Sequence, residues 1–193
     1  MSNPRVVFLT DGVVTLRPVF KTDLPFLLSC ANDPSVRQYI GRYLPQLEAD
    51  EEEWLIRMSK NKQTDIVFAI EVEGAMIGIM GIHKINWKDR TGDTGAMIRD
   101  SELRGKGYGT RAKMMVLDYA FHELNLRKIC SAAIAFNVAS LRFNEKCGYK
   151  EEGRRRKQVW KNGEYHDLVL TAVFQEDFEP LWKVHKEKHG IAI

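Results

Sequence analysis

The chain has 193 residues, of which 44% are hydrophobic and 28% charged, and its formal net charge at pH 7 is +3. This composition is typical of one soluble globular domain, and the small net charge says little about partners. No apolar run reaches the roughly 18 residues that a membrane span needs, and the first residues lack the layout of a signal peptide. The cysteines at positions 30, 130 and 147 share no metal-ligand spacing, so we expect reduced thiols, no metal and a cytoplasmic location.

Hydrophobic periodicity predicts strands and helices that alternate along the chain. Two hairpin turns are indicated by Glu73-Gly74 and Asn162-Gly163. We expect strands at 13–17, 66–72, 75–85, 93–99, 128–135, 149–157 and 164–174, and helices at 22–32, 48–60, 110–124 and 139–146. No repeat or linker interrupts this pattern, so we expect one domain over 1–193.

A glycine-rich segment lies between the predicted strand at 93–99 and the predicted helix at 110–124. Glycine lets the backbone bend tightly and approach a ligand, and the start of a helix attracts anions through its unpaired N–H groups and its dipole. The segment has glycines at every second position and basic residues beside them: Leu103, Arg104, Gly105, Lys106, Gly107, Tyr108, Gly109 and Thr110. This arrangement predicts a site for a phosphate-bearing cofactor.

Spacing separates the candidate phosphate-binding motifs. A P-loop needs a Gly-Lys pair followed by Ser or Thr, and the chain has none. Residues 107–112 fit the relaxed dinucleotide pattern G-x-G-x-x-A, which also needs an acidic residue about 20 positions further on. The next predicted strand ends in Ala135-Phe136-Asn137, without a carboxylate. The dinucleotide interpretation is therefore disfavoured.

A third interpretation rests on two motifs together. Arg104-x-x-Gly107-x-Gly109 resembles the R/Q-x-x-G-x-G/A signature of the GNAT acetyltransferase superfamily. The segment from Asn137 to Tyr149, which reads NVASLRFNEKCGY, resembles the second landmark of that superfamily, N-x-x-[AS]-x-x-L-Y-x-K-x-G-F. The resemblance covers roughly 13–174. It implies an α/β (α+β) fold, a single GNAT domain with a mixed, mostly antiparallel central sheet flanked by helices, followed by a C-terminal extension at 175–193.

The resemblance also implies an activity. Within the superfamily the chain is most similar to the ribosomal-protein alanine and spermidine acetyltransferases. We therefore expect an acetyl-CoA-dependent N-acetyltransferase that acts on a primary amine, either a protein N-terminus or a polyamine, by direct transfer. In the superfamily the glycine segment binds the pyrophosphate, and the strand before it pairs with the pantetheine arm. The further cofactor-binding residues implied by the resemblance are Met97, Ile98, Arg99, Asn137, Ser140, Asn144 and Lys146.

Amine acetylation needs a base, because an alkylamine is protonated at pH 7. Asp93, two residues before Gly95, reproduces the spacing of a glutamate found in many relatives; counting back from Gly105 selects Thr94 instead, which cannot act as a base. The simpler interpretation of Asp93 is a strand-edge residue after a turn.

The residue that serves as general acid is also undecided, because Asn144 replaces the tyrosine that protonates the leaving thiolate in the superfamily. An amide cannot donate in this way. The candidates are Ser140, Tyr149 and Tyr165, or the thiolate leaves without a protein acid, which a thiol of pKa about 8.5 tolerates.

Other features carry alternatives. A CoA-binding regulatory module without catalysis would explain Asn144, and an RNA- or ribosome-associated binder could use the basic run at 154–157, although a solvated strand explains that run more simply. The acidic run at 50–53 could attract a polyamine or could be an ordinary helix start. We expect no membrane partner and no required nucleic acid. The final hairpin could support a homodimer, and Trp160 could line an acceptor cleft.

Overall fold

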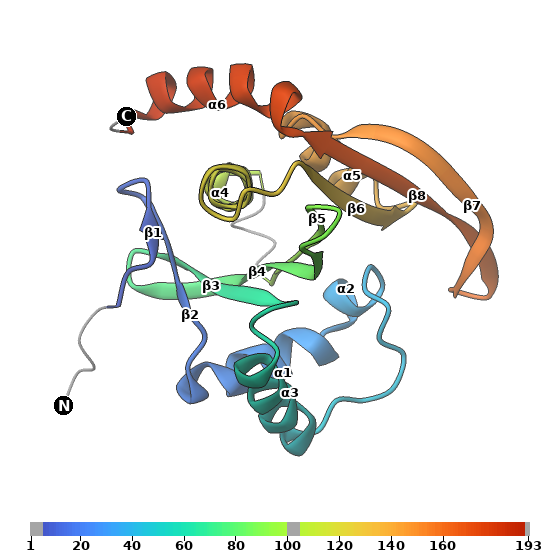
Figure 1. Cartoon of the computed structure of the whole chain (residues 1–193). Coiled ribbons are helices and arrows are strands. Elements are labelled where there is room, and N and C mark those ends of the chain that lie inside the picture. The colour runs from blue at the N-terminus through green and yellow to red at the C-terminus, as the bar shows by residue number, and fades with distance from the viewer. Residues whose placement is uncertain (1–5, 100–104, 192–193) are drawn as a thin grey trace.

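The computed structural model describes residues 6–99 and 105–191. Its centre is one eight-stranded sheet with the order β1-β2-β3-β4-β5-β6-β8-β7 (Figure 1). The strands are β1 (Leu9–Thr10), β2 (Val14–Pro18), β3 (Ile66–Val72), β4 (Ala75–Asn86), β5 (Thr91–Ile98), β6 (Lys128–Ile134), β7 (Lys150–Lys161) and β8 (Glu164–Phe174). The helices are α1 (Leu24–Asn32), α2 (Pro34–Arg37), α3 (Glu48–Lys60), α4 (Tyr108–Asp118), α5 (Val138–Lys146) and α6 (Gln175–His189), with a 3-10 turn η1 (Lys21–Asp23) and a π-helical turn η2 (Tyr119–Glu123).

Strand direction follows from the connections. Neighbouring strands are antiparallel throughout the sheet except for β5 and β6. A parallel pair needs a long crossover, and α4 provides it between these two strands. The sheet is therefore mixed and mostly antiparallel, with helices on both faces, as the sequence predicted.

The helices form two layers around the sheet. α4 and α6 lie on one face, and α1 and α3 lie on the other (Figure 1). All residues from Ala112 to Leu117 in α4 are buried, so this helix is enclosed on every side. The main apolar core lies between α4 and the sheet and includes Leu16, Ile70, Met80, Ile82, Val116, Leu117 and Ile129. α1 buries a smaller set on the opposite face: Leu24, Leu27, Cys30 and Ala31.

The predicted elements are confirmed to within a few residues, and three further elements are new. The dipeptide Asp33-Pro34 was expected only to end a helix. It also begins α2, because the Asp33 carboxylate accepts a hydrogen bond from the Ser35 N–H at 2.8 Å. The short strand β1 and the helix α6 were not predicted, and β7 extends to Lys161 rather than ending at Lys157.

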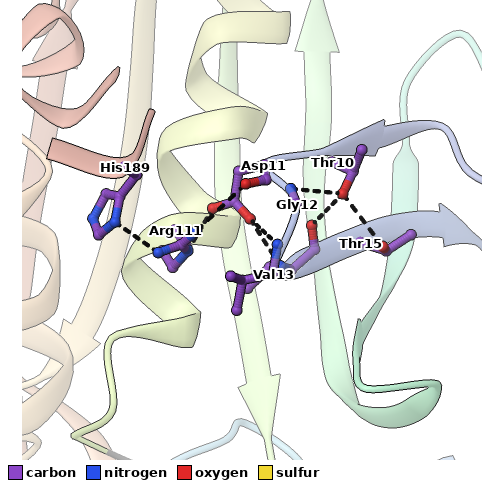
Figure 2. Close-up of polar contacts among 8 residues, drawn as sticks. Thr10, Asp11, Gly12, Val13, Thr15, Arg111 and His189 are labelled. Carbon is purple, nitrogen blue, oxygen red and sulfur yellow. Dashed lines mark hydrogen bonds and ion pairs between the residues drawn. The ribbon is translucent and has the colours of Figure 1, made fainter. Parts of the chain in front are cut away.

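The C-terminal extension is part of the packed structure. Phe178 and Trp182 of α6 are buried in the main core. Figure 2 shows the polar contacts that join α6 to α4 and to the turn between β1 and β2. Arg111 of α4 donates to the Asp11 carboxylate at 2.5 Å and contacts His189 Nδ1 at 2.6 Å. The Asp11 side chain is fully buried, so these contacts fix three distant parts of the chain together.

Candidate active site

β5 and β6 diverge in the middle of the sheet. Their pairing is limited to Thr91–Lys128, Gly92–Ile129 and Asp93–Cys130, whereas β5 stays paired with β4 as far as Ile98. Beyond Asp93, Gly95 and Ala96 are exposed although they belong to a central strand. Strand backbone groups are normally paired on both sides. The gap therefore offers hydrogen-bonding groups to an extended ligand.

The glycine-rich turn lies against the same end of β5. A Cβ added to Gly109 would lie 3.0 Å from Ile98 Cδ1 and 3.6 Å from the Phe143 ring, so the first turn of α4 packs closely on β5 and α5. Gly105 and Gly107 have φ angles of +85° and +87°, in the left-handed region that glycine adopts readily. Gly107 is the N-cap of α4, so the N–H groups after it have no partner within the helix.

The predicted pyrophosphate residues fall into two groups. Lys106 is exposed beside the two left-handed glycines, and Tyr108, Gly109 and Thr110 form the partly buried first turn of α4. Together they present backbone N–H groups and positive charge at the start of an 11-residue helix. Leu103 and Arg104 lie outside the described residues.

The strand residues proposed for the pantetheine arm border the gap. Met97 and Ile98 pair with Ile79 and Gly78 of β4. A Cβ on Gly78 would lie 2.2 Å from the Met97 carbonyl oxygen, so only glycine permits this close approach of the two strands. The Arg99 side chain turns toward α1 and donates to Ser29 Oγ at 3.0 Å.

Helix α5 places its predicted residues at different depths. Asn137 is the N-cap, and its side-chain oxygen accepts a hydrogen bond from the Ser140 N–H at 3.2 Å. Both residues follow β6, the strand that diverges from β5. Lys146 is exposed in the last turn, at the opposite end of the helix.

Asn144 contacts a buried lysine that the sequence analysis missed. The Asn144 side chain is 1% exposed; its Oδ1 accepts a hydrogen bond from Lys113 Nζ at 2.5 Å, and its Nδ2 donates to Thr171 Oγ1 at 3.3 Å. Lys113 Nζ also lies 4.5 Å and 4.4 Å from the ring centroids of Phe143 and Tyr149. Burial lowers the pKa of Lys113 to about 8. Asn144 therefore holds an ammonium group inside the core.

The tyrosine candidates lie in contrasting surroundings. Tyr149 is buried, and its hydroxyl shares a hydrogen bond of 2.6 Å with Thr94 Oγ1. Burial raises the pKa of Tyr149 well above its ordinary value. Tyr165 is 60% exposed and packs edge-on against Trp160 near the β7–β8 turn. The Tyr149 hydroxyl therefore lies at Thr94, the first residue after the last β5–β6 pair, whereas Ser140 follows the end of β6 in α5.

Asp93 occupies the last paired position before the strands separate. It lies opposite His83 of β4 and beside Cys130 of β6. Its carboxylate accepts a hydrogen bond from Lys84 Nζ at 3.0 Å. The neighbouring His83 forms a hydrogen bond between its Nδ1 and Asp65 Oδ1 at 2.9 Å. The sequence did not reveal this pair, because a bulge between Ile70 and Glu71 shifts the pairing by one residue from the register that a Glu73-Gly74 turn predicts.

Aromatic contacts connect the end of β6 to the segment after α2. The Phe136 ring lies 5.9 Å from the Tyr39 ring and 4.6 Å from the His166 ring. Lys161, near the β7–β8 turn, donates to the backbone oxygens of Arg37 and Arg42 at 3.0 and 3.3 Å. The α2 segment and the β7–β8 hairpin therefore meet next to the gap in the sheet.

A cavity of about 540 Å³ lies at this meeting point. Its lining includes Arg37, Arg42 and Lys161 and contains no acidic residue; the other lining residues are Pro34, Ser35, Gln38, Tyr43 and Asn162. Arg42 is paired with Glu51, so Arg37 and Lys161 supply the positive charge that favours an anionic group over a cation.

The acidic run at the start of α3 has structural partners. Asp50 caps the helix by accepting from the Leu47 N–H at 2.8 Å. Glu51 is 3% exposed and pairs with Arg42 at 2.7 Å. Glu52 pairs with Lys21 at 3.0 Å on the surface. Much of the charge in this run is therefore already compensated within the chain.

None of the described helices is long and apolar enough to cross a membrane. This matches the absence of long apolar runs in the sequence.

Comparison with known proteins gives a consistent result. Residues 14–150 match the family described as acetyltransferase (GNAT) domain. The spermidine N(1)-acetyltransferase of Escherichia coli K12 is 28% identical over 167 residues, covering 86% of this chain and 88% of that protein. The putative ribosomal N-acetyltransferase YdaF of Bacillus subtilis is 32% identical over 107 residues, covering 55% of this chain and 58% of the relative. The crystal structure of a Vibrio cholerae spermidine N-acetyltransferase with CoA and spermine superposes with a TM-score of 0.79 at 26% identity, covering 86% and 98% of the two chains.

These matches agree with the geometry described above. The family match spans the β5–β6 gap, the glycine turn and α5, and the comparisons do not favour a non-catalytic binding module or an RNA binder. The implied co-substrate suits the local structure, since no described atom lies within 4 Å of where a Cβ would stand on Gly105 or Gly107, just before α4. The chain belongs to the GNAT acetyltransferase family and is an acetyl-CoA-dependent N-acetyltransferase.

Proposed function

We propose that the protein binds acetyl-CoA in the gap between β5 and β6 and transfers the acetyl group directly to a primary amine. The observation that carries this proposal is the divergence of β5 from β6 after Asp93, beside a helix that begins with exposed left-handed glycines. Backbone N–H groups from Gly105 to Thr110 bind the pyrophosphate, together with Leu103 and Arg104. Met97, Ile98 and Arg99 form the wall along the pantetheine arm.

The catalytic step needs little from the protein beyond positioning and one proton transfer. Holding the amine against the thioester converts a bimolecular step into an effectively unimolecular one. Asn144 and Tyr149 are buried and hydrogen-bonded to other side chains, so we assign them to supporting the wall of the site. The thiolate leaves without a protein acid, and the Ser140 hydroxyl, which follows the end of β6, donates a hydrogen bond to it.

The acceptor is a primary amine, and two classes are proposed. The named spermidine acetyltransferases support a polyamine. The basic cavity lined by Arg37, Arg42 and Lys161 favours an amine that carries an anionic group, such as a protein N-terminus followed by acidic residues. We also propose a cytoplasmic location, independence of nucleic acid, a single domain over 1–193 and a homodimer.

Steady-state thiol release tests the proposed function. Acetyl-CoA is mixed with the purified full chain and either spermidine or a peptide with a free N-terminus followed by acidic residues, and the product is identified by mass spectrometry. We expect CoA release that depends on the amine and a mass gain of one acetyl group. Absence of amine-dependent CoA release with both acceptors would contradict the proposal. Preference for the peptide would support the role of the basic cavity, and preference for spermidine would remove it.

A further inference from the structure

A histidine–aspartate pair lies on the sheet surface beside the gap. His83 of β4 is directly opposite Asp93 of β5, so both side chains lie on one face of the sheet. Gly95 and Arg99 share that face by alternation along β5. Arg99 contacts Ser29 in α1, which identifies this face as the one that α1 and α3 cover. The buried residues Ile82 and Thr94 point to the opposite face, toward α4.

Asp65 fixes the orientation and tautomer of His83. Its Oδ1 lies 2.9 Å from His83 Nδ1, and its Oδ2 accepts a hydrogen bond from Thr64 Oγ1 at 2.8 Å. Partial burial acts to raise the pKa of Asp65, but the hydrogen bonds from Thr64 and His83 outweigh it and hold the pKa below its ordinary value. A carboxylate can only accept, so Nδ1 carries the hydrogen and the neutral ring presents a lone pair on Nε2.

The Nε2 atom lies over glycine backbone at the edge of the gap. A Cβ added to Gly81 would lie 2.9 Å from Nε2, and one added to Gly95 would lie 3.9 Å from it. Because both positions are glycine, no side chain stands between the ring and the strands. The His83 side chain is 35% exposed, and Gly95 is exposed. An amine over Gly95 is therefore within reach of a hydrogen bond to Nε2.

We propose that His83, oriented by Asp65, is the base that removes the proton from the acceptor amine; this rests on the acetyl transfer proposed above. The amine nitrogen attacks the thioester carbonyl carbon, the N–C bond forms, and the C–S bond breaks with its electron pair leaving on sulfur. The extra proton on nitrogen moves to Nε2. The imidazolium then returns the proton to solvent.

Imidazole suits this role better than the nearby carboxylate. A base works best when its pKa is near the working pH, and an ordinary histidine has a pKa of about 6.5, against about 4 for an aspartate. Asp93 is also engaged by Lys84. Asp93→Asn therefore tests the competing candidate base, because it removes that carboxylate while keeping the imidazole.

The test compares His83→Gln, Asp65→Asn and Asp93→Asn with the wild-type chain, using spermidine and an N-terminal peptide as acceptors. We expect His83→Gln to lower kcat by about 10²–10⁴-fold with unchanged acetyl-CoA affinity by calorimetry. The part of the fall in rate at acidic pH that the base contributes disappears in that variant, whereas the part due to protonation of the acceptor amine remains. Asp65→Asn retains this limb, shifted to lower pH, with a smaller loss of kcat. Asp93→Asn lowers kcat by less than His83→Gln does, and a larger loss in Asp93→Asn would overturn the inference.

Two further results complete the test. Free imidazole should restore part of the activity of His83→Ala, an effect that a merely structural histidine would not produce. Wild-type turnover together with an unchanged pH profile in His83→Gln would overturn the inference while leaving the acetyltransferase proposal intact. If His83→Gln does not fold, an unchanged pH profile in Asp65→Asn overturns it instead. If the wild-type chain acetylates neither acceptor, the proposed function itself fails and the inference fails with it.

Discussion

Replacing the buried lysine of α4 tests the packing beneath the site. Lys113 is 2% exposed, and burial lowers its pKa from 10.5 to about 8. At about 1.4 kcal/mol per pKa unit, keeping this ammonium charged costs the folded state about 3 kcal/mol. Lys113→Met removes that cost, but it leaves Asn144 Oδ1 buried without its donor, a penalty of about 1–3 kcal/mol. The single substitution should therefore change the free energy of unfolding at pH 7 by less than about 2 kcal/mol.

The double variant Lys113→Met with Asn144→Leu removes both polar partners. It should be more stable than the sum of the single variants predicts, because neither partner is left buried alone. Thr171 keeps its hydrogen bond to the Ser131 carbonyl in this variant.

The pH dependence gives a sharper result. The folded pKa of Lys113 lies below the unfolded value, so the unfolded chain binds more protons between about pH 8 and 10.5. The contribution of Lys113 to the free energy of unfolding therefore rises with pH through that window. Burial raises the pKa of Cys147 to about 11, which acts in the opposite direction, so the wild-type curve alone is ambiguous. The difference between Lys113→Met and wild type reports the lysine together with its electrostatic coupling to Cys147.

Urea denaturation at intervals from pH 7 to pH 10.5 measures this difference. The stability of Lys113→Met relative to wild type should fall by about 3 kcal/mol across the range. A difference that does not change with pH would refute the reasoning, because it would mean that the lysine has an ordinary pKa and is hydrated.

Three further predictions concern the packing around the site. His185 is buried, which lowers its pKa to about 4. Because the unfolded pKa is higher, the free energy of unfolding should fall by at most about 3 kcal/mol as the pH drops from about 6.5 to 4. His185→Phe should remove this fall in urea denaturation. Asp11→Asn removes the charge partner of Arg111, whose side chain is 12% exposed, and should cost about 1.5–3 kcal/mol, measured by thermal unfolding. Gly78→Ala places a Cβ 2.2 Å from the Met97 carbonyl oxygen and should cost about 1–3 kcal/mol and weaken acetyl-CoA binding measured by calorimetry.

The sequence predicted the elements that follow strong local signals. The glycines before α4 and the Asn162-Gly163 turn depend on φ angles that few other residues adopt, so their sequence is informative. The helix α6 was missed for a local reason. It has a proline at position 180 and many lysines, while its buried face reduces to Phe178, Trp182 and His185. Such a narrow apolar stripe is hard to distinguish from a solvated tail.

Long-range partners could not be predicted in the same way. Lys113 and Asn144 are 31 positions apart in the sequence, and a lysine is ordinarily expected at the surface. Only the packing of α5 on α4 makes Asn144 a hydrogen-bond acceptor for it. His83 and Asp65 are joined by the register of β3 and β4, in which Ile66 pairs with Ile82. One residue of slip would have placed them on opposite faces.

Acetyl-CoA binding to Gly107→Val, measured by isothermal titration calorimetry, tests the central claim most directly. Gly74→Val is the matched control, because Gly74 has a similar φ of +80° in the β3–β4 turn and, like Gly107, nothing within 4 Å of an added Cβ. Both variants bear the same kind of backbone strain, which costs about 1–3 kcal/mol. We predict that Gly107→Val loses acetyl-CoA binding while Gly74→Val keeps the wild-type affinity. Unchanged affinity in Gly107→Val would contradict the assignment of the glycine turn to the cofactor.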